Sequence, residues 1–220
     1  MTRTRREPLT RERVLQAALE LADAGGFHSL SMRKVAAGLG VEAMSLYNHV
    51  ANKEDIVDGL VDLVFDEIEV AEPGSTDWKV AMRERAVSVR AALGRHRWAV
   101  GLMEGRLNPG PANLRNHDAV MGCLREGGFA FRDAVHAYSV MDAYIYGFAL
   151  QERGLPFDAP EESAEVMRRQ RETIPSMDDH PYLVETAMEL EQAGYDYDEE
   201  FHFGLELVLD GIERFKDGAA

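Results

Sequence analysis

The sequence predicts an all-α protein with two domains and about ten helices. Apolar residues recur at intervals of three and four along most of the 220 residues, which is the spacing of one helix face. No stretch beyond residue 76 alternates apolar and polar residues as a half-buried strand would. Clusters of glycine and proline, such as Gly25-Gly26 and residues 105–111, separate the helical segments.

Residues 31–50 have the pattern of a helix-turn-helix unit. Ser31 is placed to cap a helix over 32–39, and Gly40 follows, where a helix can end with positive φ. A second helix over 43–50 begins almost at once. Two short helices joined by a turn that contains glycine form this unit. The outward groups of its second helix are suited to reading base edges in a major groove.

The neighbouring residues complete a small N-terminal domain. Apolar spacing predicts a first helix over 11–24, and Asn52 is placed to cap a fourth helix over 53–70. We predict that residues 1–52 form the helix-turn-helix domain. The fourth helix would link it to an effector-binding and dimerisation domain over residues 71–220.

These segments resemble the DNA-binding domain of the tetracycline-repressor (TetR) family. The residues that carry the resemblance are Ala17-Ala-Leu-Glu-Leu, Gly25-Gly26, Leu30-Ser-Met-Arg-Lys-Val-Ala, Leu39-Gly-Val, Leu46-Tyr-Asn-His-Val and Asn52-Lys-Glu-Asp-Ile. The resemblance implies DNA contacts by Ser31, Arg33, Ala43, Met44, Ser45, Tyr47, Asn48, His49 and Lys53. Of these, Tyr47 and Lys53 are expected at phosphates. Asn48 carries an amide that can pair bidentately with adenine.

The distribution of charge supports DNA binding, although the net charge is −15. Residues 1–53 hold eight Lys or Arg and five acids, a charge of +3, whereas the other 167 residues hold 16 basic and 34 acidic groups. Residues 1–53, which we call the head, are cationic and would be attracted to a phosphate backbone. The anionic remainder of the chain would be repelled from it. The basic residues 1–9 predict an arm that either contacts DNA or is simply solvated.

The rest of the chain predicts further helices. We expect them over 78–93, 98–103, 114–125, 131–153, 182–192 and 198–216, with an irregular loop over 155–181 that holds a short helical piece at 162–171. This half resembles the ligand-binding domain of the tetracycline repressor's own branch of the family. The residues that carry this resemblance are Ala92-Leu-Gly-Arg-His-Arg, Gly127-Gly-Phe and Phe203-Gly-Leu-Glu-Leu-Val-Leu-Asp-Gly-Ile-Glu-Arg.

The resemblance makes the helix over 131–153 and the last helix the pair that forms a homodimer. Both are apolar around most of their circumference, so they must be buried on several sides. A subunit interface or a central position in a monomer would satisfy that pattern. The expected interface residues are Ile145, Phe148, Leu205, Val208, Leu209 and Ile212.

The resemblance also places an effector pocket in the second domain. Its expected lining residues, each of which could instead belong to the plain core, are Phe65, Met82, Trp98, Leu102, Met103, Met121, Tyr138, Met141 and Tyr144. A lining rich in methionine and aromatic groups suits an apolar or planar molecule. Glu69 and Met103 stand where the tetracycline repressor holds the magnesium of its drug with histidines. We therefore do not expect a tetracycline–magnesium ligand, and we assign no metal site and no cofactor.

No catalytic constellation is present in the sequence. The seven histidines have no pair at metal-ligand spacing, and neither a phosphate loop nor a nucleophile elbow occurs. One cysteine, Cys123, fits a reducing cytoplasm and is expected to be buried. No signal peptide or membrane-spanning run is found. The resemblance to the TetR family implies a homodimeric repressor that a small molecule releases from a palindromic operator. The alternatives are an activator or regulator without an inducer, and an all-α enzyme.

Overall fold

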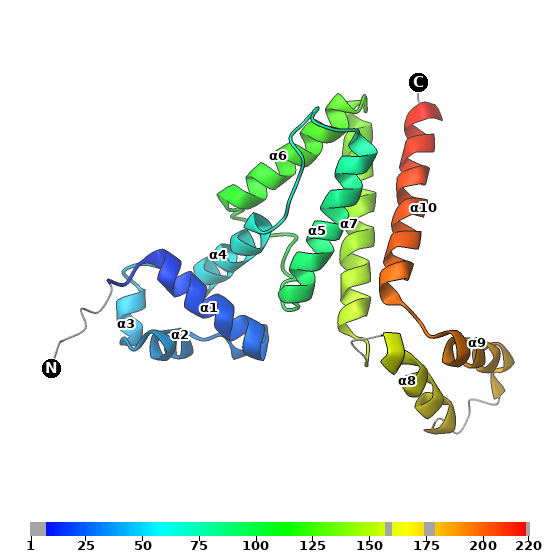
Figure 1. Cartoon of the computed structure of the whole chain (residues 1–220). Helices are drawn as coiled ribbons and strands as arrows, with labels where there is room; N and C mark the ends of the chain where they lie inside the picture. Colours follow the sequence, from blue (N-terminus) through cyan, green and yellow to red (C-terminus); the bar gives the residue numbers. More distant parts are fainter. Residues whose placement is uncertain (1–7, 157–159, 174–178, 219–220) are drawn as a thin grey trace. The chain divides into compact units, whose positions relative to one another are not determined.

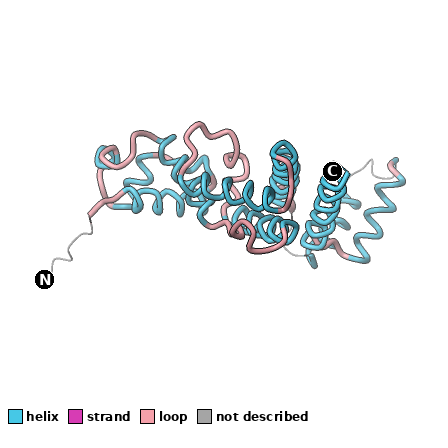
Figure 2. Tube along the Cα trace, turned by 90° about the horizontal axis from the view of Figure 1, so that it is seen from above, coloured by secondary structure: helices cyan, strands magenta, loops and turns pink. Residues whose placement is uncertain are grey.

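A computed structural model describes residues 8–156, 160–173 and 179–218 (Figure 1). Over these residues every regular element is a helix, as the tube in Figure 2 shows, so the all-α prediction is confirmed. The elements are α1 (Arg11–Gly25), the short 3-10 turn η1 (Phe27–Ser29), α2 (Met32–Leu39), α3 (Ala43–Leu46), α4 (Lys53–Asp66), α5 (Trp78–Arg95), α6 (Pro111–Glu126), α7 (Phe131–Arg153), α8 (Pro160–Thr173), α9 (Pro181–Ala193) and α10 (Tyr197–Gly218). None of these described helices is long and apolar enough to cross a membrane.

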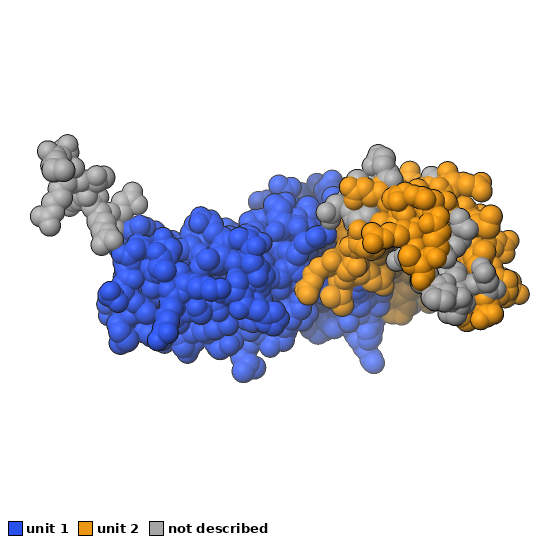
Figure 3. All heavy atoms as spheres, turned by 90° about the horizontal axis from the view of Figure 1, so that it is seen from below, with its two compact units in different colours: residues 1–149 blue, residues 150–220 orange. Residues whose placement is uncertain are grey.

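The chain divides into two compact units, Met1–Ala149 and Leu150–Ala220, which Figure 3 draws in blue and orange. The predicted change of domain at residues 53–70 lies inside the first unit, so that functional division stays a prediction. Most of the basic arm predicted over residues 1–9 lies outside the described residues.

The predicted helix caps are present. Side-chain oxygens of Thr10, Ser31 and Asn52 accept backbone hydrogen bonds in the first turns of α1, α2 and α4. Each satisfies an N–H that a helix start leaves without a partner. Gly40 ends α2 with φ 63°, a left-handed conformation that favours glycine. These features fix the ends of the helix-turn-helix unit where the sequence places them.

The second helix of the helix-turn-helix unit, which we call the recognition helix, is shorter than the predicted range of 43–50. α3 ends at Leu46, and residues 47–49 form a turn rather than continuing the helix to residue 50. Asn48 and His49 have low helix propensity, and the cap of α4 follows them closely. The inward positions still agree with the prediction, because Leu46 and Val50 are both buried.

α4 is also shorter than predicted, ending at Asp66 instead of residue 70. Its cap residue, Glu67, accepts hydrogen bonds from Arg95 and pairs with His96. These contacts hold Glu67 beside the end of α5, so the chain leaves the α4 helix at this point.

The helix predicted over 98–103 is wrong. This segment forms successive turns, in which Ala99 donates to the carbonyl of His96 and Leu102 donates to that of Ala99. Trp98 donates its Nε1 hydrogen to Asp23 in α1 at 2.7 Å. That bond holds the segment against α1, and Gly101 lowers its helix propensity further.

Residues 155–181 hold more helix than the irregular loop that the sequence predicts. α8 covers Pro160–Thr173, and a proline is tolerated in the first turn of a helix. Arg168 pairs with Glu165 in the preceding turn and with Glu172 in the following turn, at 3.5 Å in the second case. Side chains three or four residues apart are neighbours on a helix surface, so these pairs favour the helical conformation. The ends of the remaining helices agree with the prediction to within three residues.

α4 is held between two neighbours within the first unit, because it contacts both α1 and α6. A Cβ at Gly59 would lie 2.6 Å from Cδ2 of Leu15 in α1, so a larger residue there would force the Leu15 side chain to move. On another side, the segment before α6 approaches so closely that a Cβ at Gly110 would overlap the side chain of Asp62. Any displacement of α4 is therefore felt by α1.

Two smaller features complete the core. Cys123 is buried in α6, and its thiol donates to the carbonyl oxygen of Ala71 at 3.2 Å. Burial raises the pKa of this thiol, which disfavours the reactive thiolate. In the second unit α8 packs on α9, and the buried hydroxyl of Ser163 accepts the N–H of Tyr195 at 3.0 Å.

Candidate DNA-binding surface and effector cavity

The outward face of the recognition helix presents its side chains to solvent. Met44 is 75% exposed and Tyr47 is 47% exposed, although both are large. Asn48 is exposed too, and Ser45 is half-buried. These side chains are accessible to a partner, as the predicted DNA contacts require. The predicted base-reading residues therefore share one accessible face, supported from below by the buried Leu46.

Lys53 lies at the first position of α4, shortly after the recognition helix and the turn over residues 47–49, which together we call the recognition segment. Its ammonium sits 4.9 Å from the centre of the Phe27 ring, a cation–π distance. The free N–H groups and the positive dipole end of α4 are at the same place. Lys53 is thus presented at a point that favours an anion, which fits its predicted contact with a phosphate.

An ion pair fastens the start of α4 to α1. The guanidinium of Arg11 donates to both carboxylate oxygens of Asp55, at 2.6 and 3.0 Å. Asp55 also accepts the N–H of Ala51 at 2.7 Å. The hydrogen bonds from Arg11 lower the pKa of Asp55 below its ordinary value. This bidentate pair holds the recognition segment and α4 together.

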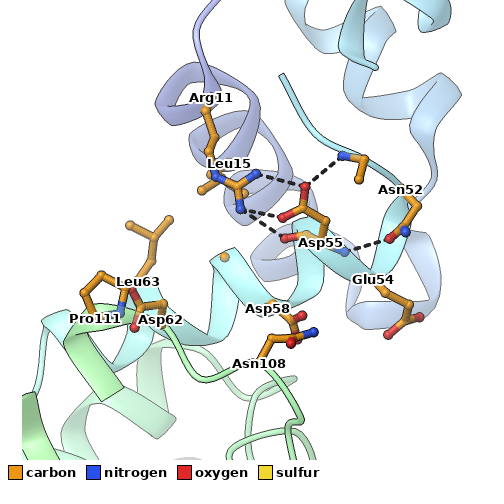
Figure 4. A pocket seen from close by; sticks show the side chains of 13 residues that line it. Arg11, Leu15, Asn52, Glu54, Asp55, Asp58, Asp62, Leu63, Asn108 and Pro111 are labelled. Atoms are coloured by element: carbon orange, nitrogen blue, oxygen red, sulfur yellow. Dashed lines mark hydrogen bonds and ion pairs between the residues drawn. The ribbon is translucent and has the colours of Figure 1, made fainter. Parts of the chain in front are cut away.

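Four carboxylates of α4 face a hollow of about 590 Å³, shown in Figure 4. They belong to Glu54, Asp55, Asp58 and Asp62. Arg106 occupies two of them, donating through Nε to Asp58 at 2.7 Å and pairing with Glu54 at 3.2 Å. Asp55 is taken by α1 as described above, and Asp62 accepts a backbone N–H from α6 at 2.9 Å. All four are engaged, so the hollow is not arranged as a cation site.

His96 joins the other end of α4 to α1. Its imidazole is 6% exposed, with Nδ1 2.8 Å from Asp23 and Nε2 3.0 Å from Glu67. Trp98 donates to the same oxygen of Asp23, so that carboxylate acts as an acceptor. His96 therefore links α1 to the end of α4 through both of its ring nitrogens.

A cavity of about 500 Å³ lies farther along α4. It is lined by Phe65, Met103, Glu104, Gly105, Arg106, Pro109, Asn113, Leu114, His117, Asp118, Met121 and Tyr138. Four of the predicted lining residues are present: Phe65, Met103, Met121 and Tyr138. They supply its apolar and aromatic part.

The other five predicted residues do not line this cavity. Met82 and Met141 are fully buried in the core, Trp98 is turned toward Asp23, and Tyr144 lies against Phe148 with ring centres 5.9 Å apart. Leu102 belongs to the turns that replace the predicted helix. Because that segment is not helical, its side chains take directions that the predicted helix would not give them.

The cavity is more polar than the sequence predicts. The loop before α6 contributes Glu104 and Arg106, and α6 itself contributes Asn113, His117 and Asp118. Burial, and then the charge of Asp142, raise the pKa of Glu104. The sequence carries no periodic signal for the loop residues, since residues 104–109 follow neither a helix nor a strand pattern. Asn113 and His117 are four residues apart, so their shared face could have been noticed.

A buried ion pair lies near the cavity. Arg85 in α5 is 1% exposed and donates from Nη1 to Oδ1 of Asp142 in α7 at 2.7 Å. Among the described residues, Nε and Nη2 of Arg85, Oδ2 of Asp142 and the hydroxyl of Tyr146 are buried without a hydrogen-bond partner. An unmade buried hydrogen bond costs about 1–3 kcal/mol. Sequence reasoning missed this pair, because its two partners are 57 residues apart.

The described residues contain no group of three or more His, Cys, Asp or Glu side chains that could hold a metal ion.

Comparison with known proteins identifies the two parts of the chain. Residues 14–60 match the family model described as "Bacterial regulatory proteins, tetR family", and residues 70–215 match "Tetracyclin repressor-like, C-terminal domain". The second match alone covers more than half of the chain. The chain belongs to the TetR family. It is therefore a ligand-responsive, DNA-binding transcriptional regulator and not an enzyme.

Relatives of this TetR-family regulator agree over nearly its whole length. The HTH-type transcriptional repressor DrrR1 of Streptomyces coeruleorubidus is 32% identical over 93% of this chain and 77% of its own. The tetracycline repressor protein class C of Escherichia coli is 28% identical over 94% of this chain and 92% of its own. Apo ActR from Streptomyces coelicolor is 28% identical, covers 97% of this chain and 99% of its own, and superposes with a TM-score of 0.79.

TetR-family regulators bind operator DNA as dimers, and the residues predicted at the dimer interface differ in their exposure. Ile145, Leu205, Leu209 and Ile212 are buried within one chain, while Phe148 and Val208 are half-buried. Their contact with a second chain stays a prediction. The exposed apolar residues of the same two helices are Phe131, Val135, Val140, Leu150, Phe203, Leu207 and Phe215. The periodic pattern identified the helices but not which apolar face is left open.

Proposed function

We propose that this regulator is a homodimeric, cytoplasmic repressor of a palindromic operator, released from DNA by a small organic molecule. The observation that carries the proposal is the position of α4. It begins with Lys53 beside the recognition segment, and Phe65, near its other end, lines the 500 Å³ cavity. One rigid element thus belongs to both the proposed DNA-binding surface and the proposed effector site.

The proposed DNA contacts follow from exposure and charge. Met44, Ser45 and Asn48 would face base edges, Ala43 would lie beside them against thymine methyl groups, and Tyr47 would contact the phosphate backbone. The other backbone contacts proposed are Ser31, Arg33, His49 and Lys53. The head carries the positive charge that such contacts need, whereas the rest of the chain is strongly acidic.

The proposed effector site is the cavity beside α4. Its volume of about 500 Å³ lies in the range of about 300–1,000 Å³ that holds drug-sized molecules. ActR, which shares this fold at 28% identity, has been solved in complex with actinorhodin and with (S)-DNPA. By analogy, a molecule with a planar, partly apolar body would lie against Phe65, Met103, Met121 and Tyr138.

Release would come from a movement of α4. Arg106 lines the effector cavity and pairs with Glu54 and Asp58 in the first two turns of α4. A ligand that displaced Arg106 would change how the start of α4 is held, next to Lys53. The hollow beside α4 leaves space for such a movement. Because α4 packs tightly on α1 at Gly59, the recognition helix would move with it.

We propose that the dimer forms through the open apolar face of α10. Phe203 and Leu207 are four residues apart, and Phe215 lies two further turns along, so they share one side of α10. Two recognition helices would then be about 34–36 Å apart, the spacing of successive major grooves.

Selection of genomic DNA fragments on the purified protein, followed by gel-shift titration, tests the proposal. Lys53→Ala should weaken binding to every selected sequence. It should also make the slope of log affinity against log salt concentration shallower by about 1, the change expected for one lost phosphate contact. The matched control is Lys79→Ala, which removes the same charge from α5, outside the head. If Lys53→Ala and Lys79→Ala have the same small effect, the proposed backbone contact is wrong. If no sequence is selected above random DNA, the repressor proposal itself fails.

A further inference from the structure

Arg85 keeps one edge of its guanidinium free although the side chain is almost completely buried. Its Nη1 donates to Asp142, whereas Nε and Nη2 have no partner among the described residues. These two nitrogens lie on the same edge, where their N–H groups are parallel and match a pair of oxygen acceptors. Oδ2 of Asp142 and the hydroxyl of Tyr146 are buried and unpartnered as well. The cluster therefore offers two donors, one acceptor and one hydroxyl that can act as either.

Tyr138 lies between this cluster and the proposed effector cavity. It lines the cavity and accepts or donates a hydrogen bond with His117 there, at 3.2 Å. The guanidinium carbon of Arg85 is 5.5 Å from the centre of the Tyr138 ring. Glu104, which also lines the cavity, is close enough to Asp142 for that charge to raise its pKa. Tyr138, which is half-buried, thus lies next to both the cavity and the unused hydrogen-bonding groups.

The charges around the cluster restrict what it can bind. Asp142 already balances Arg85, so a ligand carboxylate would add a second buried negative charge beside a single cation. Glu104 and Asp118 on the cavity lining would repel it further. A neutral carbonyl with a neighbouring hydroxyl avoids this difficulty. Its two oxygens would accept hydrogen bonds from Nε and Nη2 of Arg85, and its hydroxyl would donate a hydrogen bond to Oδ2 of Asp142.

We propose that Arg85, Asp142 and Tyr146 form the inner end of the effector site and select a neutral molecule in which a carbonyl is flanked by a hydroxyl. The inference rests on the proposed function, because it takes the cavity beside α4 as the effector site. The ligand body would occupy the cavity, and its hydroxy-carbonyl edge would reach the cluster past Tyr138. Arg85 and Asp142 are then the residues that determine specificity.

Two planar probes of the same ring system test this inference. One is a dihydroxyanthraquinone in which both hydroxyls flank one carbonyl, and the other is anthraquinone without hydroxyls. Calorimetric titration of the full-length dimer should give a dissociation constant about tenfold or more lower for the dihydroxy probe, since the other leaves buried polar groups unpaired. The double variant Arg85→Met/Asp142→Leu removes both charges together and should bring the ratio of the two constants close to one.

The control variants separate specificity from folding. Arg97→Met makes the same change at an exposed position and should keep the wild-type ratio. Arg85→Lys keeps the charge but loses the fork, so it should lower the ratio even if the double variant proves unstable. Because only ratios are compared between proteins, differences in probe solubility cancel.

A ratio of the two dissociation constants near one for the wild-type protein overturns the inference. A double variant that keeps the wild-type ratio overturns it too, because the cluster would then hold only buried water. Failure of both probes to bind overturns the proposed ligand class. Operator binding by the wild-type protein without any probe is measured separately. Its loss would count against the repressor proposal and leave the binding site standing, so the two failures are distinguishable.

Discussion

The recognition unit and the region around the effector cavity hold their functional side chains in contrasting ways. In the recognition unit, Met44, Tyr47 and Asn48 stand open to solvent on a helix of one turn, anchored by a single buried leucine. Around the cavity, Arg85 and Asp142 are enclosed in the core and leave hydrogen-bonding atoms unused. In the proposed function, the first region would meet DNA without rearrangement, whereas the second would admit a small molecule into the protein.

This contrast has an energetic consequence. An exposed side chain contributes little to folding, so the recognition face is free to match an operator. A buried ion pair depends on both of its members, because removal of one leaves an uncompensated charge. Substitutions should therefore change DNA affinity but not stability in the first region, and change stability strongly in the second.

The largest expected effect is on stability at the buried pair. Arg85→Met should lower the free energy of unfolding by about 3–5 kcal/mol, because Asp142 stays buried without its cation. Urea denaturation measures this change. Arg85→Met/Asp142→Leu, which removes both charges, should recover most of the loss. A single variant that loses less than about 1 kcal/mol would show that the pair is not as isolated from water as the structure indicates.

The next effect concerns His96, which links α1 to the end of α4. His96→Ala removes two hydrogen bonds to carboxylates, each worth about 1.5–3 kcal/mol, and should lower stability by roughly 2–3 kcal/mol after relaxation. His96→Gln keeps one donor and should lose less. Thermal and urea unfolding of the two variants test this order. Equal stability of wild type and His96→Ala would show that this link between α1 and the end of α4 contributes nothing measurable.

A third prediction concerns Asn48 on the open face. Asn48→Ala should change operator affinity by about 1–3 kcal/mol and relax base preference at one position of each half-site. Its free energy of unfolding should stay within about 0.5 kcal/mol of the wild type, because Asn48 is exposed. Selection of binding sites with the variant protein measures the first effect. An unchanged base preference would remove Asn48 from the proposed base contacts.

The smallest effect is a pH dependence at the start of α4. Arg11 lowers the pKa of Asp55 below the ordinary value of 3.8. The pair therefore stabilises the protein at neutral pH, and this contribution is lost as the pH falls through the lowered pKa. Both side chains are partly exposed, so the contribution should be under about 1 kcal/mol. Arg11→Met should flatten the acid limb of the stability curve slightly; an identical limb would mean that the pair contributes nothing measurable.

The same contrast explains what could be predicted from the sequence. The recognition unit is local: Ser31, Gly40 and Asn52 act on neighbours a few residues away, so caps and turn could be placed correctly from the pattern. The cavity depends on contacts between distant segments. Trp98 could not be seen to reach Asp23, 75 residues away. Because the Trp98 side chain points toward α1, the segment around it is not the predicted helix. Trp98 and Leu102 therefore do not line the cavity.

Two further features have the same origin. The helices that hold Ile145 and Leu205 are apolar around most of their circumference, a pattern that does not say which residues a single chain already buries. Arg106 lies in a loop without periodicity, so its contact with both the cavity and α4 has no sequence signal. Periodicity locates helices, whereas tertiary contacts decide which face is used.

The central claim is that a ligand in the cavity moves the recognition helices through α4. Spin labels at Glu42→Cys, in a Cys123→Ser background, would report the distance between the two heads of the dimer. Glu42 is exposed and its side chain makes no cap hydrogen bond. Saturation with the dihydroxyanthraquinone probe should shift the distance distribution away from that of the operator-bound protein, and Arg106→Met should reduce the shift. A distribution that stays unchanged while calorimetry shows the probe bound would contradict the account.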